Sequence, residues 1–262
     1  MTERLLINQF TQILSCNTDS VKLYQQRYPH LASRIEYLKN PVDSGIFYSL
    51  SREKRDEVRR NYARWLGLSD DTSFVLFAGR LHPQKDPILL VRSIAALQQQ
   101  NVHLLIAGEG ELADEVQAEI SQLGLSKQIT MLGGVVQTKV AQLQQISSVF
   151  VLTSSYEGLP LVVLEALACG TPIVTTQCGE TPNLLCANSG IVCQERTPIA
   201  IAEAISKVLL RPDDYSVDSC IRAAEPYAVR NIVNTVYSDM WRRWEQRFLV
   251  GIPASYVQAS RD

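Results

Sequence analysis

Two glutamates eight positions apart stand out because their surroundings do not suit charged side chains. Residues 154–174 read SSYEGLPLVVLEALACGTPIV, which predicts a strand end, a glycine-containing loop, and a helix that begins after Pro160 and ends at Gly170. The helix is apolar nearly all round and should be buried, yet Glu165 lies in its middle. A buried carboxylate needs hydrogen-bond donors, supplied either by protein groups in the core or by hydroxyl groups of a bound ligand.

The other acid, Glu157, favours the ligand. It is expected at the carboxyl end of a strand, and open α/β sheets bind their ligands outside that edge. Glu157 and Glu165 would then flank the beginning of one helix. We therefore interpret the two acids as part of a binding site, and a Glu165 satisfied within the core is the alternative.

A loop with two cations follows an earlier predicted strand. The segment FAGRLHPQKDP places Gly79, Arg80 and Lys85 just before a helix start at Asp86-Pro87. Most Arg and Lys side chains are simply solvated, which is the alternative here. A helix N-terminus nevertheless binds phosphate through its free N–H groups and its dipole, worth about 0.3–1 kcal/mol, and cations add charge-assisted hydrogen bonds. The loop is therefore a candidate phosphate site.

A glycine-rich turn follows the next predicted strand. The segment GEGELA, which begins at Gly108, resembles the dinucleotide fingerprint G-x-G-x-x-A. An NAD site would also need an acidic residue at the end of the following strand, and QITMLGG ends instead in leucine and glycine. We interpret the glycines as a tight turn that lines a ligand, with an ordinary turn as the alternative.

A regular alternation of strands and helices must position these loops. Short apolar runs alternate with longer amphipathic segments, which is typical of a Rossmann-like, doubly wound parallel sheet in an α/β protein. Six runs are predicted strands: 74–79, 103–108, 128–133, 149–154, 172–176 and 189–193. Further helix starts are predicted at Thr181-Pro182 and Thr197-Pro198. Residues 1–40 contain one short βαβ unit, and an amphipathic helix is predicted after residue 225.

The composition argues against several classes of function. Of the 262 residues, 46% are hydrophobic and 20% are charged, with a net charge of -2, so a nucleic-acid-binding surface is not expected. The six cysteines form no C-x-x-C pair, and there is no D-x-D pair of acids, so neither a metal site nor a redox centre is expected. Neither a signal peptide nor an apolar span of about 20 residues is found, which predicts a cytoplasmic protein. The basic residues between Arg52 and Arg64 alternate with acids and predict a solvated helix face.

Taken together, GRLHPQKDP, GEGEL, and the Glu157-GLPLVVL-Glu165 block with its trailing EALACGTPIVTT resemble the nucleotide-sugar-binding domain of family 4 glycosyltransferases, which have the GT-B fold. The resemblance runs from about residue 35 to residue 244. It implies a retaining transferase that moves a sugar from a nucleoside diphosphate donor to an acceptor hydroxyl, with no cofactor and no metal.

The resemblance also implies roles for individual residues. Glu165 would bind the ribose hydroxyls. Arg80, Lys85 and Glu157 would be the catalytic residues. The other donor contacts would come from Gly79, Gly108, Glu109, Gly133, Gly158, Leu159, Pro160 and Leu161.

The same resemblance implies how the chain is divided. Residues 1–40 would be a remnant of the acceptor-side domain, residues 41–225 the donor domain, and residues 226–262 a helix that packs on the acceptor-side domain, followed by a tail. We therefore expect the chain to be the donor-binding part of a transferase, truncated or wrongly started at Met1. The alternative is a non-catalytic module completed by a separate acceptor-domain polypeptide. The acceptor would be a sugar or a lipid-linked sugar. Arg242, Arg243 and Arg247 lie beside aromatic residues, a pattern that would also suit peripheral association with a membrane.

Overall fold

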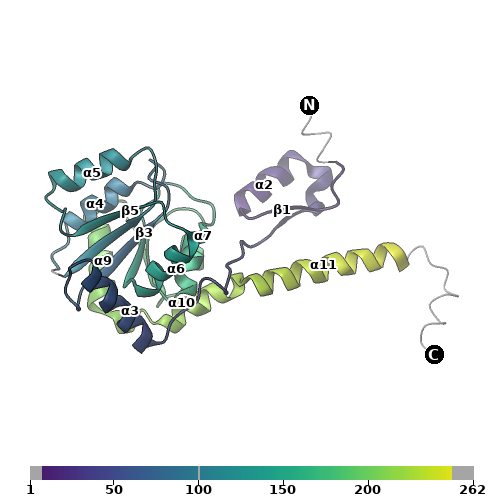
Figure 1. Ribbon diagram of the computed structural model, residues 1–262. Coiled ribbons are helices and arrows are strands. Elements are labelled where there is room, and N and C mark those ends of the chain that lie inside the picture. The colour runs from purple at the N-terminus through teal and green to yellow at the C-terminus, as the bar shows by residue number, and fades with distance from the viewer. Residues whose placement is uncertain (1–7, 100, 250–262) are drawn as a thin grey trace.

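The computed structural model describes residues 8–99 and 101–249 of the chain (Figure 1). Most of them form a parallel six-stranded sheet with the order β5-β4-β3-β6-β7-β8. The strands are β3 (Ser73–Ala78), β4 (Val102–Ala107), β5 (Ile129–Gly133), β6 (Val149–Leu152), β7 (Ile173–Thr176) and β8 (Gly190–Cys193). The predicted doubly wound α/β sheet is confirmed, and each predicted strand is present within two residues of its expected bounds.

The strand order reverses between β3 and β6. From β3 the chain proceeds outward through β4 to β5, returns to β6 on the other side of β3, and proceeds outward again to β8. Loops that follow β3 and β6 therefore diverge toward opposite faces, and the space between them is where doubly wound sheets bind ligands.

Helices cover both faces of the sheet (Figure 1). Alternate strand residues point to opposite faces, so Phe74 and Leu76 belong to one core cluster, and Val75 and Phe77 to the other. The first cluster packs against α3 (Arg52–Trp65), α6 (Gln137–Ile146), α7 (Leu161–Ala168) and α10 (Val217–Ala224). The second packs against α4 (Pro87–Ala95), α5 (Ala113–Gln122) and α9 (Pro198–Leu210).

Two of the three predicted helix starts have the expected cap. The Asp86 carboxylate accepts a hydrogen bond from Leu89 N at the start of α4, and the Thr197 hydroxyl accepts one from Ala200 N at the start of α9. A helix also begins at Thr181-Pro182, but the cap predicted there is wrong. Thr181 is the first residue of the short helix α8 (Thr181–Leu184), and its buried hydroxyl has no hydrogen-bond partner among the described residues.

A small unit precedes the main sheet. It consists of β1 (Ile13–Ser15), α2 (Thr18–Arg27), the 3₁₀ helix η1 (Pro29–Arg34) and β2 (Ile35–Tyr37), and its two strands pair in parallel. Val21, Tyr28, Leu31 and Ile35 form its own small core. The unit has the βαβ order expected from the sequence.

The last helix connects the two parts of the chain. The backbone at Val42 pairs with that at Ala228, just before α11 (Val229–Leu249). Figure 1 shows α11 leaving the main sheet and running past the small unit. There Arg243 forms ion pairs with Glu36 of β2, at 2.7 Å, and with Asp239 on its own helix, also at 2.7 Å.

Candidate functional site

The loops that follow β3 and β6 meet at the carboxyl edge of the sheet. The Lys85 ammonium lies 2.5 Å from Glu157 Oε1, and Ser154 Oγ donates a hydrogen bond of 2.6 Å to the same oxygen. The side chain of Glu157 is only 7% exposed and that of Lys85 is 20% exposed. A carboxylate buried to this extent is stable only with such partners, so the pair fixes both charged groups in place.

Backbone contacts hold the two loops together beside this pair. Ser155 N donates to Gln84 O at 2.8 Å, and the Gln84 side chain donates to Tyr156 O at 2.9 Å. The neighbouring positions of β3 and β6 in the sheet make this possible, although the residues lie about 70 positions apart in the sequence.

Arg80 lies in the same loop as Lys85 but differs from it in exposure and in charge partners. Its side chain is exposed, and within residues 8–99 and 101–246 it has no ion pair or hydrogen bond. Lys85 is already neutralised by Glu157, whereas Arg80 leaves a positive charge available to an anion at this edge. The two predicted cations thus lie in one loop, but only Lys85 has an acidic partner.

The predicted glycines form a ladder across the same edge. Gly79 N donates to Ala107 O at 3.0 Å, and Gly108 N donates to Gly133 O at 2.8 Å. A Cβ atom on Gly108 would lie 1.8 Å from the carbonyl oxygen of Gly79, a separation that no side chain permits. Close packing of two loops therefore explains this glycine without a ligand.

Glu109 lies on the outer part of the edge, on the side of β4 and β5. Its side chain is exposed and lies against Gly134, where an added Cβ atom would be 1.7 Å from Glu109 Oε1. Glu109 O accepts a hydrogen bond of 2.8 Å from Leu81 N, which joins this turn to the loop after β3. The structure thus groups Gly108, Glu109 and Gly133, and a contact with a nucleotide base remains a prediction.

A loop of three residues, 158–160, separates Glu157 from the N-terminus of α7. Pro160 is its N-cap, no described side chain caps it, and Leu161 at its first position is 46% exposed. The first N–H groups of a helix have no partner within the helix, so this end is open to an anion. One backbone group and one side chain from elsewhere hold the loop: the Glu180 backbone N–H donates to Gly158 O at 2.9 Å, and Asn40 Nδ2 donates to Leu159 O at 3.2 Å.

Glu165 lies one turn into α7 and is half-buried. Burial raises the pKa of its carboxyl above the ordinary value, and a hydrogen bond with the Gln137 side chain opposes part of that shift. A protein donor therefore exists, as the core interpretation requires, but Glu165 is not fully enclosed. The ribose role stays a prediction.

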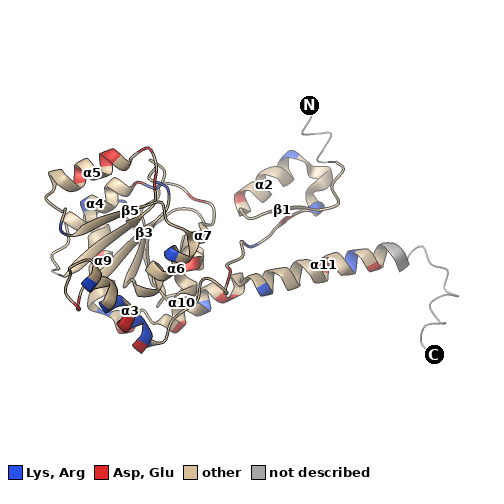
Figure 2. Cartoon of the chain, in the orientation of Figure 1, with Lys and Arg blue, Asp and Glu red and all other residues tan. Residues whose placement is uncertain are grey.

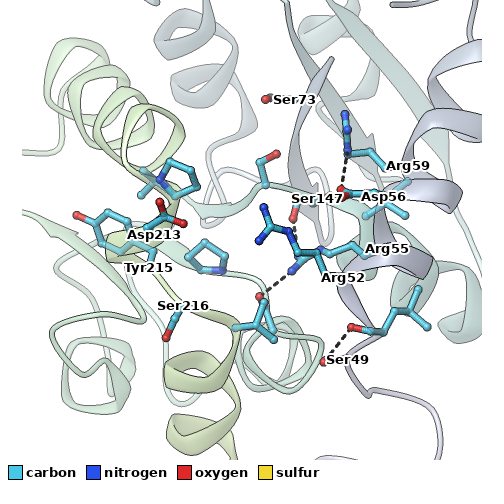
Figure 3. A pocket seen from close by; sticks show the side chains of 18 of the residues that line it. Ser49, Arg52, Arg55, Asp56, Arg59, Ser73, Ser147, Asp213, Tyr215 and Ser216 are labelled. Atoms are coloured by element: carbon cyan, nitrogen blue, oxygen red, sulfur yellow. Dashed lines mark hydrogen bonds and ion pairs between the residues drawn. The ribbon is translucent and has the colours of Figure 1, made fainter. Parts of the chain in front are cut away.

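A large cavity of mixed polar and apolar lining lies away from all of these residues. It measures about 660 Å³ and is lined from α3 on one side and from the segment around Tyr215 and Ser216 on the other (Figure 3). The residues before β3, β6 and β7 also line it, so it lies at the amino edge of the sheet. None of the predicted site residues reaches it.

One basic residue beside this cavity corrects the prediction for α3. Acidic and basic positions do alternate along the helix (Figure 2), but Arg55 is half-buried, and desolvation of its guanidinium lowers its pKa. Its guanidinium donates to Ser147 O at 2.9 Å, to Thr171 Oγ1 at 3.1 Å and to Gly170 O at 3.2 Å. The prediction of a fully solvated face is therefore wrong at Arg55, which ties α3 to the starts of two strands.

Residues 58–225, which include every one of the predicted site residues, match the family model described as glycosyl transferases group 1. The chain belongs to this family.

Known glycosyltransferases resemble the chain over part of their length. An uncharacterized glycosyltransferase of Methanocaldococcus jannaschii is 34% identical over 155 residues, which are 58% of this chain and 40% of the relative. The D-inositol 3-phosphate glycosyltransferase of Segniliparus rotundus is 28% identical over 245 residues, which are 90% of this chain and 49% of the relative. The chain therefore spans less than half the length of these relatives.

Solved glycosyltransferase structures share the fold. HepE of Anabaena in complex with UDP-glucose superposes with a TM-score of 0.77 at 19% identity, covering 90% of this chain and 65% of that chain. The C-terminal domain of a group 1 family protein, LpcC of Francisella tularensis, gives a TM-score of 0.61 at 18% identity and covers 72% of this chain and 99% of that domain. The chain has the α/β fold of GT-B glycosyltransferases.

The sequence did not single out every residue that shapes this candidate site. Ser154 and Thr153 follow β6 and are buried, and Arg196 follows β8. The signal that could have found them is their position, since the carboxyl ends of all parallel strands meet at one edge. Their pairings depend on the strand order, which the sequence does not show.

Proposed function

We propose that this chain binds the nucleoside diphosphate sugar of a retaining, family 4 glycosyltransferase at the sheet edge between β3 and β6. The observation that carries the proposal is the pairing of Lys85 with Glu157 at the point where the strand order reverses, next to the open N-terminus of α7. Cation, acid and free N–H groups at one edge are the groups that a sugar diphosphate needs.

In this proposal the diphosphate lies between the loop after β3 and the start of α7. Arg80 supplies a charge that no other described side chain uses, and Lys85 can donate to phosphate while keeping its contact with Glu157, because an ammonium has three donors. The described residues contain no group of three or more His, Cys, Asp and Glu side chains placed to hold a metal ion. The proposal assigns the neutralisation of the diphosphate to Arg80, Lys85 and the helix.

Bond breaking would place negative charge on the departing diphosphate and positive charge on the sugar. Groups that are already oriented toward a developing charge lower the barrier most, and loss of one typically costs about 3–4 kcal/mol. In the proposal, Glu157, which Lys85 and Ser154 hold in place, faces the sugar, and Glu165 in α7 binds the ribose. Gly108, Glu109 and Gly133 would border the base.

The acceptor side is proposed to come from outside the described sheet. An exposed apolar stripe on α11 supports this, since Val233, Tyr237, Met240, Trp241 and Trp244 are each at least 50% exposed. The acceptor-side domain that would cover it either continues this polypeptide or is a separate polypeptide, in which case the chain is a donor-binding module. The proposal also includes domain boundaries near residues 40 and 225. The acceptor in this proposal is a sugar or a lipid-linked sugar.

Membrane association is the less favoured role for the same helix. No described helix is long and apolar enough to cross a membrane. Of the three arginines considered for a lipid surface, Arg243 is engaged with Glu36 and Asp239, while Arg242 is 67% exposed beside the two tryptophans. The side chain of Arg247 lies outside the described residues. The proposal therefore favours packing of the exposed α11 stripe on an acceptor-side domain over contact with a membrane.

The proposal is tested by calorimetric titration of the chain with UDP, GDP, ADP and NAD. We expect one nucleoside diphosphate to bind more tightly than NAD, and Glu165→Ala to abolish that binding. Glu203→Ala, which removes an exposed acid on α9 far along the chain from the site, is the matched control and should leave it unchanged. A preference for NAD, or binding that survives Glu165→Ala intact, would reject the proposal.

A further inference from the structure

Three loops of the sheet edge are tied together directly behind Lys85. The Thr153 hydroxyl, fully buried after β6, lies 2.8 Å from Lys85 O and 2.9 Å from Asp86 O, and donates to these carbonyls. Arg196, in the loop after β8, forms an ion pair with Asp86 through Nη2, and its Nε donates to Thr153 O at 3.3 Å. Residues that lie 110 positions apart thus meet at one point.

The backbone at Asp86 shows why this turn needs support. Its dihedral angles, φ 46° and ψ 63°, lie in the left-handed region, which residues other than glycine seldom adopt. Such a conformation persists only where several contacts demand it. Here the carboxylate is held by Leu89 N at 3.1 Å and by Arg196, and the carbonyl by Thr153.

This turn decides where Lys85 points. Lys85 precedes Asp86, and both residues donate their N–H groups to His82 O, at 2.9 Å and 3.1 Å. If Asp86 relaxed to an ordinary conformation, the side chain before it would leave the line toward Glu157. The ion pair between Arg196 and Asp86 opposes that relaxation.

We propose that Arg196 is a positioning residue, which holds the left-handed turn at Asp86 so that the Lys85 ammonium faces Glu157 and the donor diphosphate. Arg196 itself touches neither donor nor acceptor in this assignment. The inference rests on the proposed function, because it takes Lys85 as a ligand of the diphosphate. It concerns a residue outside the motifs that the sequence singled out.

A direct role for Arg196 in binding phosphate is the competing explanation. Its side chain is 39% exposed, so part of the guanidinium is accessible. The two explanations make opposite predictions for Asp86→Asn, which keeps a capping side chain that tolerates the left-handed region but removes the charge. A positioning residue would lose its hold on the turn, whereas a phosphate ligand would be released from its acid and bind anions better.

The test compares UDP, GDP and ADP, each with its own monophosphate, in calorimetric titrations of the full chain. The measured quantity is the preference for diphosphate, the ratio of the two dissociation constants. We expect Lys85→Ala to lower this preference roughly tenfold, as the loss of a charge-assisted hydrogen bond does. Arg196→Ala should lower it by a similar factor with little change in monophosphate affinity, and should add nothing to Lys85→Ala. Arg196→Lys should restore part of the preference.

Arg211→Ala, which removes an exposed arginine at the other end of α9, is the control and should change neither constant. An equal loss of monophosphate and diphosphate binding in Arg196→Ala would show a merely structural role and overturn the inference. An unchanged preference in Arg196→Ala, or tighter diphosphate binding by Asp86→Asn, would also overturn the inference.

If Arg196→Ala does not fold, Arg196→Lys and Asp86→Asn test the inference through the same ratio of dissociation constants. A wild-type chain that binds no nucleoside diphosphate would overturn the proposed function and this inference together, whereas normal wild-type binding with an unaffected Arg196→Ala would overturn this inference alone.

Discussion

At the scale of single residues, the two predicted cations differ in what they already do for the protein. Lys85 compensates a carboxylate that is only 7% exposed, while Arg80 is exposed and has no partner among the described residues. Residue types and spacing could predict that both lie at one sheet edge. They could not predict this difference, because it depends on β6 lying next to β3.

The difference predicts that two alanine variants will separate binding from stability. Arg80→Ala and Lys85→Ala should both weaken nucleoside diphosphate binding by roughly tenfold or more, since each removes a charge-assisted contact. Only Lys85→Ala should also lower the free energy of unfolding, by up to about 3 kcal/mol, because it leaves a buried carboxylate without its cation. Calorimetry and urea denaturation measure the two effects. Lys207→Ala, an exposed cation on α9, serves as the control. Equal stability of the Arg80 and Lys85 variants would show that the buried pair is not formed in solution.

At the scale of elements, the strands were predictable because each is a short apolar run that ends near glycine or a polar residue. The Asp86 and Thr197 caps were predictable for the same local reason. The cap predicted at Thr181 is wrong because α8 begins one residue early: Glu180 is the N-cap residue, and Thr181 already lies within the helix. The prediction for Arg55 is wrong because its burial depends on residues before β6 and β7, which lie 92 and 115 positions away in the sequence. Local sequence patterns thus predict the helices and strands. They do not predict features that depend on contacts between distant elements, such as the burial of Arg55.

The glycine ladder gives a prediction at this scale. Gly108→Ala should destabilise the fold by about 1–3 kcal/mol or prevent folding, because the new methyl group would meet the backbone of Gly79 at 1.8 Å. Gly124→Ala is the matched comparison: it also has a positive φ, of 69°, but nothing lies within 4 Å of its Cβ position. It should cost only about 1–2 kcal/mol of backbone strain. Urea denaturation of both variants measures the difference, and a smaller loss at Gly108 than at Gly124 would contradict the close approach of these loops.

At the scale of the whole molecule, the small unit and the main sheet touch where the site is proposed. The Thr18 hydroxyl donates to Glu180, and Asn40 donates to the backbone of the loop between Glu157 and α7. The sequence indicated a crossing near residue 40 but not these contacts, which need the relative placement of both parts. Movement of the small unit would therefore be felt directly by the loop that follows Glu157.

The exposed stripe on α11 supplies the last prediction, because its position separates two explanations for apolar residues on one helix. If Tyr237, Met240 and Trp241 serve a partner surface, replacing all three with serine should leave the free energy of unfolding of this chain within about 0.5 kcal/mol per site, as for exposed positions in general. Ile232 on the same helix is only 8% exposed, so Ile232→Ala should cost about 2 kcal/mol or more. Urea denaturation compares the two variants. A large loss from the triple variant would mean that the stripe is packed within this chain in solution, and it would remove the main structural support for an acceptor-side domain that covers α11.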